Sequence, residues 1–271
     1  MRQIFPAAAE APEIESVAPG AGPAASAITA LARLYAYPPM AARATPWVRA
    51  NMITSVDGAV ALNGRSGGLS ADADRLVFSV LRSLADVILV GAGTARAEKY
   101  RLAHQGKIWA ALREGRPPTP PIAVVTRELD LDLDGPLLAD AAGQARTILL
   151  TTQAAPADRR AAAAARADVI LTGPDSVTPA AAVGALAARG HRRILVEGGP
   201  RLLRQITEAG LLDELCVTFS PVLEGGRAGR ILAPPARTGA AVGHSPATGL
   251  ALAHVLEDSG SLLCRYLRDP G

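Results

Sequence analysis

Residues 88–94 read ILVGAGT and residues 194–200 read ILVEGGP, and in each an apolar run ends in glycines just before a helical pattern. Apolar runs of this length are typical of buried parallel strands, whose carboxyl ends form the ligand-binding edge of a sheet. Glycine lets backbone N–H groups approach a phosphate, and the following helix N-terminus is partially positive. Taken singly, each segment is also an ordinary strand-to-helix turn, the first capped by Thr94. Together they predict one dinucleotide site at one sheet edge.

Outward from these turns, short apolar runs alternate with helical stretches along most of the chain. Strands are predicted at 47–55, 87–91, 122–126, 147–151, 169–172, 194–197 and 215–220, and helices at 72–84, 94–99, 158–166, 179–188 and 201–209. Residues 250–257 and 261–267, joined by Asp258-Ser259-Gly260, predict a β-hairpin. The expected fold class is α/β, with a mainly parallel central sheet, helices on both faces and a C-terminal antiparallel hairpin.

Three regions are expected along the chain. Residues 1–25 are rich in alanine and proline without periodicity, which predicts a flexible tail. Residues 26–46 hold one amphipathic helix and a linker that contains Pro38-Pro39. Residues 47–271 then form a single domain, since no internal repeat or second domain stands out.

Composition excludes several classes of protein. The net charge is only +3 with 3% aromatic residues and no dense basic block, which does not favour a nucleic-acid partner. The two cysteines and four histidines lack metal-ligand spacing, so no metal site is expected. The first residues lack the basic and apolar regions of a signal peptide, and no apolar run reaches the ~20 residues of a membrane helix. A cytoplasmic protein with no membrane partner is therefore expected.

Several stretches match one known family in order and spacing. They are SVDG (55–58), GRS (64–66), LR (81–82), VGAGT (90–94), VEGG (196–199), GLLDEL (210–215) and SPVL (220–223). Together they resemble the reductase half of the bifunctional riboflavin-biosynthesis deaminase-reductase, over about residues 47–267. The zinc signatures of the deaminase half do not occur. This resemblance implies a dihydrofolate-reductase-like fold.

The resemblance also implies a reaction and a set of site residues. The family uses NADPH to reduce the ribosyl side chain of 5-amino-6-(5-phosphoribosylamino)uracil to ribityl. Carried over to this chain, Asp57 would lie near the reacting centre and orient or supply a proton, and Ser66, Arg82 and Glu197 would contact the substrate. Arg82 would clamp the phosphate through its bidentate guanidinium. Cofactor contacts would come from Ile53, Gly91, Thr94, Glu98, Arg127, Gly199, Pro200, Arg201, Leu202 and Leu203, with Arg127 favouring a 2′-phosphate.

Two other functions remain open at this stage. Dihydrofolate or another pterin would fit the same fold, and several motif positions depart from the family pattern, including Gly68 and the segment 98–100. A non-catalytic NADPH-binding protein descended from the reductase is the second alternative. A homodimer is expected by family analogy alone.

Overall fold

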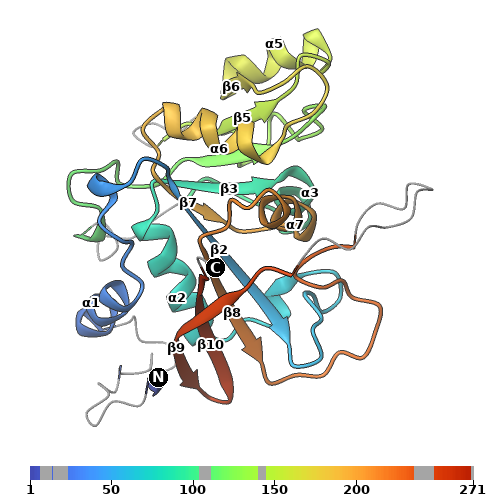
Figure 1. Ribbon diagram of the computed structural model, residues 1–271. Helices are drawn as coiled ribbons and strands as arrows, with labels where there is room; N and C mark the ends of the chain where they lie inside the picture. The colour runs from blue at the N-terminus through green and yellow to red at the C-terminus, as the bar shows by residue number, and fades with distance from the viewer. Residues whose placement is uncertain (7–13, 15–23, 104–110, 140–144, 235–246, 270–271) are drawn as a thin grey trace.

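The computed structural model describes residues 1–6, 14, 24–103, 111–139, 145–234 and 247–269. Their strands form one ten-stranded sheet in the order β1-β9-β10-β8-β2-β7-β3-β4-β5-β6 (Figure 1). The strands are β1 (Arg2–Phe5), β2 (Trp47–Ser55), β3 (Val87–Gly91), β4 (Ile122–Val125), β5 (Ile148–Thr151), β6 (Asp168–Leu171), β7 (Arg193–Val196), β8 (Glu214–Ser220), β9 (Leu250–Asp258) and β10 (Ser261–Arg268).

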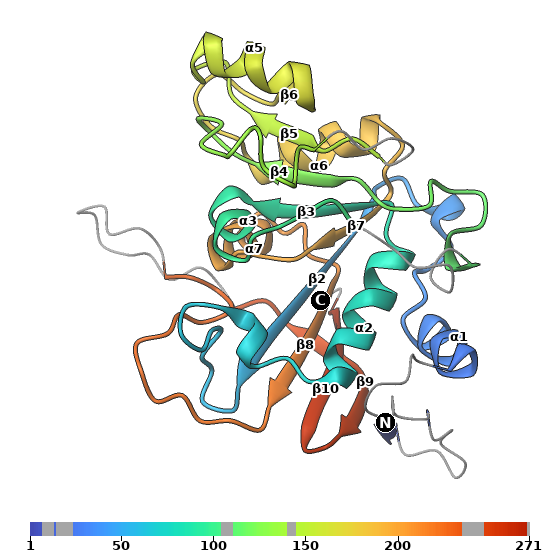
Figure 2. The same cartoon turned by 180° about the vertical axis from the view of Figure 1, so that it is seen from behind.

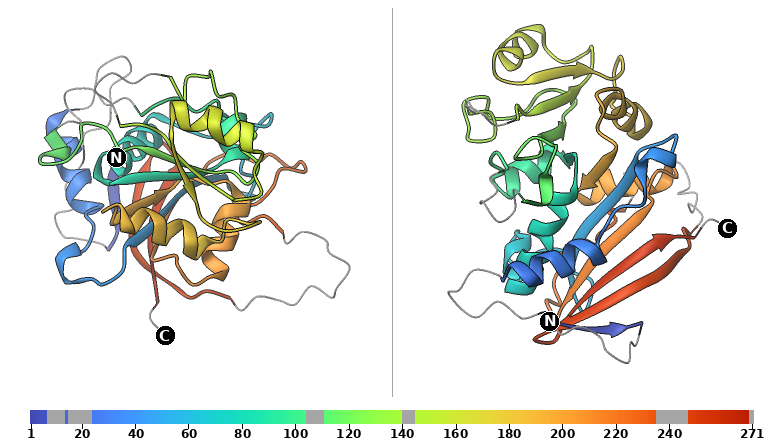
Figure 3. Two further views of the ribbon diagram at one scale, coloured as in Figure 1. Left: turned by 90° about the horizontal axis from the view of Figure 1, so that it is seen from above. Right: turned by 90° about the vertical axis from the view of Figure 1, so that its left-hand side faces the viewer.

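The sheet is parallel from β8 to β6 and antiparallel from β8 to β1. The expected α/β class, the parallel body and the terminal hairpin are therefore confirmed. The molecule extends along the sheet, with the β9–β10 hairpin at one end and α5 at the other (Figure 3). Because the central strands run in one direction, the turns that follow them meet at one edge of the sheet.

Helices cover the two faces of this sheet. They are α1 (Ala25–Leu34), α2 (Asp72–Leu84), α3 (Ala92–Ala97), α5 (Ala157–Arg166), α6 (Pro179–Ala188) and α7 (Pro200–Glu208). Short 3-10 turns occur at Met40–Ala42, Ser66–Gly68 and Ala111–Arg113. Buried side chains of α1, α2 and α5 share one apolar cluster, while those of α6 and α7 belong to the cluster on the opposite face. Figure 2 shows α2 alongside β8 on the face that carries α1.

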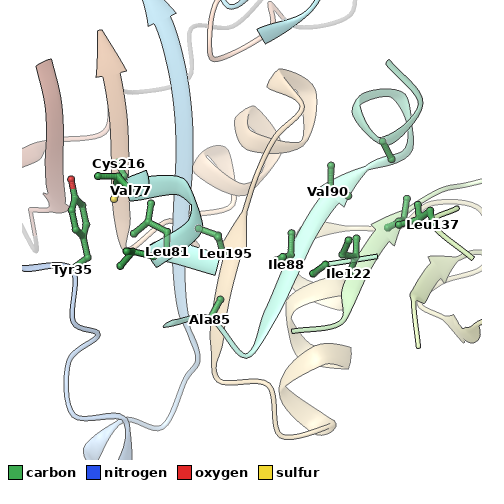
Figure 4. Close-up of a cluster of buried hydrophobic side chains, with 14 of the residues drawn as sticks. Tyr35, Val77, Leu81, Ala85, Ile88, Val90, Ile122, Leu137, Leu195 and Cys216 are labelled. Atoms are coloured by element: carbon green, nitrogen blue, oxygen red, sulfur yellow. The ribbon is translucent and has the colours of Figure 1, made fainter. Parts of the chain in front are cut away.

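The α2 helix is the element of the core that matters most for the site. Its apolar residues recur at helical spacing, so Val77 and Leu81 pack between Cys216 of β8 and Leu195 of β7 (Figure 4). Full burial of side chains of this size stabilises a fold by about 1.5–3 kcal/mol each. This packing fixes the helix against the sheet, and with it the polar residues on its other side.

The first residues depart from the prediction. Arg2–Phe5, expected within a flexible tail, form an edge strand that pairs antiparallel with β9. The prediction is wrong for this segment because backbone pairing with a strand some 250 residues later leaves no local sequence signal. The rest of the predicted tail lies outside the described residues, apart from the buried Met1 and Ile14, Pro6 and residues 24–25.

Two further findings concern the described part of the chain. No helix in it combines the length and the apolar character that crossing a membrane requires. No three histidine, cysteine or carboxylate side chains within it gather as a metal ion would need.

Candidate active site

The two glycine turns touch one another. The Gly91 amide, at the end of β3, donates a hydrogen bond to the Gly198 carbonyl at 3.0 Å, and the peptide between Gly198 and Gly199 is cis. A Cβ added to Gly199 would overlap the Thr94 hydroxyl, so only glycine allows this close approach. Gly199 is also the N-cap of α7, and no side chain caps that helix. The free amides of its first turn therefore suit an anion.

A cavity of about 610 Å³ opens beside these turns. Its lining comes from β2, from the loop that follows it, from α2 and from the two glycine turns. Eight predicted site residues line it: Ile53, Ser66, Arg82, Thr94, Glu98, Glu197, Gly199 and Pro200. Both turns, which were expected at one edge of the sheet, thus line the same cavity. This volume lies within the usual range for a small-molecule pocket.

Glu197 forms the charged centre of the cavity. Arg82 binds it in bidentate fashion, with Nε donating to Oε1 at 2.7 Å and Nη2 to Oε2 at 2.6 Å. The Tyr100 hydroxyl donates to the same Oε2 at 2.7 Å. Burial disfavours the Arg82 charge, but the Glu197 carboxylate outweighs that effect and raises the pKa of Arg82 above its usual value. The bidentate edge predicted to clamp a phosphate is thus occupied by Glu197.

Tyr100 stays protonated in this cluster. Burial and the negative charge of Glu197 raise the pKa of the Tyr100 phenol well above its usual value. The Arg82 guanidinium also lies over the Phe78 ring, at 4.3 Å from its centroid, and over the Tyr100 ring at 5.5 Å. These contacts fix the orientation of Glu197, which is only 7% exposed.

Asp74 is a second buried carboxyl group in the lining, on the first turn of α2 and 8% exposed. The Ser70 hydroxyl donates to its Oδ2 at 2.5 Å, and the Thr218 hydroxyl of β8 also hydrogen-bonds it. Burial raises the pKa of Asp74, and these two hydrogen bonds offset the rise only in part. Unlike Glu197, Asp74 makes no ion pair with a cation within the described residues.

The serine loop is tied to the first glycine turn. The Ser66 amide donates to Glu98 Oε1 at 2.9 Å, although the two residues are 32 positions apart. Glu98 caps the end of α3, so this bond closes one wall of the cavity. Both residues were predicted as site residues, and the structure brings them together.

Asp57 does not line the cavity. Its carboxylate accepts hydrogen bonds from the Ser55 hydroxyl at 2.5 Å and from the amides of Glu224 and Gly225 at 3.2 and 2.8 Å. The Ser55 and backbone hydrogen bonds lower the pKa of Asp57 to about 2. This exposed side chain thus joins the end of β2 to the loop after β8 and remains ionised.

Five more predicted residues lie outside the lining. Arg127 is exposed and pairs with the neighbouring Glu128. Leu202 and Leu203 are buried in the apolar cluster beneath α7, where they hold the helix on the sheet, and Arg201 is exposed. Gly91 lies behind the second turn, against Gly199. The side chains of Leu202 and Leu203 are therefore unavailable to a cofactor, whereas those of Arg127 and Arg201 reach solvent.

Several lining residues were not predicted from sequence. They are Asn51, Met52, Ser70, Asp74, Arg75, Phe78, Lys99, Tyr100, Arg101 and Leu102, together with small residues of the loops. One signal was present for two of them: Asp74 and Phe78 precede the predicted Arg82 at intervals of four residues, which places all three on one face of α2. Tyr100 stood out only as a departure from the family pattern.

The comparisons with known proteins agree on one family. A model of the RibD C-terminal domain matches residues 46–260. A 2,5-diamino-6-ribosylamino-4(3H)-pyrimidinone 5′-phosphate reductase from Archaeoglobus fulgidus is 31% identical over 188 residues, 67% of this chain and 83% of that protein. The reductase of the same name from Methanothermobacter thermautotrophicus is 29% identical over 69% of this chain and 83% of its own length.

A solved structure is also similar. It is a pyrimidine reductase-like protein from Corynebacterium diphtheriae, with 25% sequence identity and a TM-score of 0.77. The match covers 89% of this chain and 99% of that one.

Proposed function

The chain belongs to the RibD C-terminal domain family, and from this membership we propose that it catalyses an NADPH-dependent reduction. It is a reductase of riboflavin biosynthesis with a dihydrofolate-reductase-like fold, and it acts on a pyrimidine phosphate. The observation that carries the proposal is the contact between the two glycine turns beside the cavity. The finer assignments below are proposals for this chain.

NADPH fits the residues at this edge of the sheet. Gly199 lines the cavity without a side chain, and the uncapped start of α7 offers N–H groups to the pyrophosphate. Ile53, Glu98 and Pro200 would flank the nicotinamide half, since all three line the cavity. Arg127 would meet the 2′-phosphate from its exposed position after β4. When bound, NADPH supplies the hydride.

The protein's contribution is to position the substrate. Glu197 is held by Arg82 and Tyr100, so its carboxylate cannot swing away from the cavity. A fixed group of this kind orients a ribosylamino substrate, and orientation of two reactants can contribute ~7–11 kcal/mol to catalysis. Ser66, which also lines the cavity, would add a hydroxyl contact.

The substrate phosphate needs cations other than Arg82, whose bidentate edge is taken. Lys99 and Arg101 line the same cavity with exposed side chains, and they lie next to Tyr100 in the chain. We assign the phosphate to this pair. Guanidinium and ammonium groups at the mouth of a cavity also attract an anionic substrate over a distance.

Reduction also consumes a proton. With a pKa of about 2, Asp57 is ionised at neutral pH, and its carboxylate lies outside the lining. We infer that water in the cavity delivers the proton and that Asp57 fixes the loop after β8. The role of Asp57 as proton donor stays a prediction, which the Asp57→Asn variant tests.

We further propose a cytoplasmic homodimer. In the register of the hairpin, Leu252 pairs with Tyr266, and Leu262 lies on the same face of the sheet. Both leucines are 37% exposed, and Ile4 and Phe5 of the edge strand β1 are more exposed still. Apolar side chains on this end of the sheet suit a second copy of the chain.

The proposed function is tested by following NADPH oxidation with the purified protein. We expect turnover with a ribosylaminopyrimidine 5′-phosphate, none with dihydrofolate, and a higher kcat/KM with NADPH than with NADH. Turnover of dihydrofolate instead would assign a pterin substrate. NADPH binding in a fluorescence titration without turnover of any substrate would identify a non-catalytic binding protein.

A further inference from the structure

The proposed function assigns no role to Asp74, a buried acid in the lining of the cavity. Two hydroxyl groups, from Ser70 and Thr218, hydrogen-bond its carboxyl group. The positive charge that acts on it is that of Arg75, whose guanidinium is already bound to Asp72 at 2.7 Å and to the Ser70 carbonyl. A buried carboxyl group without an ion-pair partner is costly unless a ligand completes its hydrogen bonds.

The position of Asp74 separates it from the cofactor turns. Thr218, which hydrogen-bonds Asp74, lies on β8, whereas Thr94 and Gly199 follow β3 and β7. In the sheet order β8-β2-β7-β3, two strand spacings separate β8 from β7 and three separate it from β3, spans of about 10 and about 14 Å. A substrate whose reacting carbon lies at the cofactor end would therefore present its far side to Asp74.

The far side of the pyrimidine ring is where two candidate substrates differ. The ribosylamino group is attached at C6, so N3 is opposite to it and C2 lies beside N3. In a 2-amino-4-pyrimidinone, N3–H and the 2-amino group form two adjacent donors. In a uracil, N3–H lies beside the C2 carbonyl, which is an acceptor.

A carboxylate accepts hydrogen bonds and donates none, so it matches two donors and repels a carbonyl oxygen. We propose that Asp74 recognises the N3–H and 2-amino edge of the ring and selects a 2,5-diamino-6-ribosylaminopyrimidinone 5′-phosphate over the corresponding uracil. This inference rests on the proposed function and names the substrate class of that site. The reaction that removes the 2-amino group would accordingly follow the reduction.

The polar and charged groups that face Asp74 are consistent with this role. Ser70 precedes α2, Arg75 is next to Asp74 on the same helix, and Thr218 comes from the sheet below. Burial raises the pKa of Asp74, and the two donors of the ring would stabilise its ionised form. Substrate binding should therefore release a proton from Asp74 at a pH near its raised pKa.

The test compares the two substrates with the wild-type protein, so it needs no variant. We expect kcat/KM for the diaminopyrimidinone phosphate to exceed that for the uracil phosphate by at least ~10²-fold, because a hydrogen-bonding site rejects a mismatched group strongly. A ratio near one, or a preference for the uracil, would overturn the proposal. Turnover of neither substrate would instead refute the proposed function itself.

The variant Asp74→Asn assigns the preference to this residue. An amide both donates and accepts, so it complements the N3–H and C2 carbonyl of uracil, and the preference should fall at least tenfold or invert. The matched control is Asp72→Asn, two residues earlier on α2, whose exposed side chain lies outside the lining. It should leave the ratio unchanged.

NADPH affinity and steady-state kinetics together distinguish a folded Asp74→Asn variant from a misfolded one. NADPH affinity, measured by fluorescence titration, should stay within twofold in Asp74→Asn and so show that the site is folded. If such a variant kept the wild-type substrate ratio, the assignment to Asp74 would be wrong. A loss in kcat with unchanged KM for both substrates would also overturn it, because Asp74 would then act in the transition state and not in the choice of ring.

Discussion

Glu197 and Glu214 are both buried carboxylates held by arginine, yet their settings differ. Glu214, at the start of β8, is fully buried, with the guanidinium Nε atoms of Arg49 and Arg265 at 2.7 and 2.8 Å. The Trp47 indole also donates to it at 2.9 Å. Glu197 is held by one arginine and one tyrosine, its Arg82 partner has a side chain that is 20% exposed, and the group lines the cavity.

The other hydrogen bonds of Arg49 and Arg265 show the role of the Glu214 cluster. Arg49 donates to the Tyr35 carbonyl at 2.8 Å, and Arg265 donates to the Leu34 and Ala36 carbonyls at 2.5 and 3.1 Å. These carbonyls lie at the C-terminal end of α1, so the Glu214 cluster joins that helix to the sheet. A carboxylate held by arginine therefore stabilises the fold where it is fully buried, at Glu214. Where it lines a cavity, at Glu197, it forms part of the candidate active site.

The largest effect is expected from Glu214→Gln. The substitution leaves two arginine charges buried without a counter-charge, and breaking a buried ion pair in this way costs about 3–5 kcal/mol. We expect a loss of that size in the free energy of unfolding, measured by urea denaturation with bound NADPH absent. A loss below about 1 kcal/mol would remove the distinction between the two clusters.

The same cluster gives a pH dependence. Burial raises the pKa of Glu214, but Arg49 and Arg265 outweigh it, so the net pKa lies below the usual value of 4.5. The unfolded chain therefore binds this proton at higher pH than the folded one, and the stabilisation, complete above about pH 5, is lost as pH falls through the folded pKa. Urea midpoints at stepped pH should fall on acidification in the wild type and less steeply in Glu214→Gln.

Glu197→Gln should separate activity from stability. The amide keeps the shape but loses the charge that holds Arg82 and Tyr100, so kcat/KM should fall about 10²-fold, the scale seen when one preorganised polar group is removed. Because Arg82 is partly exposed and only one arginine loses its partner, the free energy of unfolding should fall by less than in Glu214→Gln, by about 1.5–3 kcal/mol. A variant that unfolds like Glu214→Gln while retaining activity would reverse the comparison.

Tyr100→Phe removes a single hydrogen bond to Glu197. Hydrogen bonds to charged groups contribute about 1.5–3 kcal/mol, so kcat/KM should fall about tenfold or more, yet less than in Glu197→Gln. The pKa of Tyr100 lies well above its usual value, so the pH profile between 6 and 9 should keep its shape. A changed profile would show that the phenol itself titrates during turnover.

The sequence predicted the fold well because its signals were local. The glycine turns, the α2 bounds and the terminal hairpin each follow from periodicity and turn residues. Pairings between distant residues had no such signal: β1 joins a strand near the other end of the chain, and Arg82 meets Glu197 across 115 positions. Asp74 escaped notice because an acid in a first helical turn usually serves the helix dipole.

The smallest effect is expected from Asp57→Asn, at a residue that the resemblance placed near the reacting centre. The amide keeps one acceptor oxygen, so it can still accept from the Gly225 amide, whereas its NH2 group cannot accept from the Glu224 amide. We therefore expect kcat to stay within about threefold of wild type, with an unchanged pH profile above pH 5. A hundredfold loss of kcat with a shifted pH profile would instead show that Asp57, and not water in the cavity, supplies the proton. The loop after β8 would then have to close over the substrate.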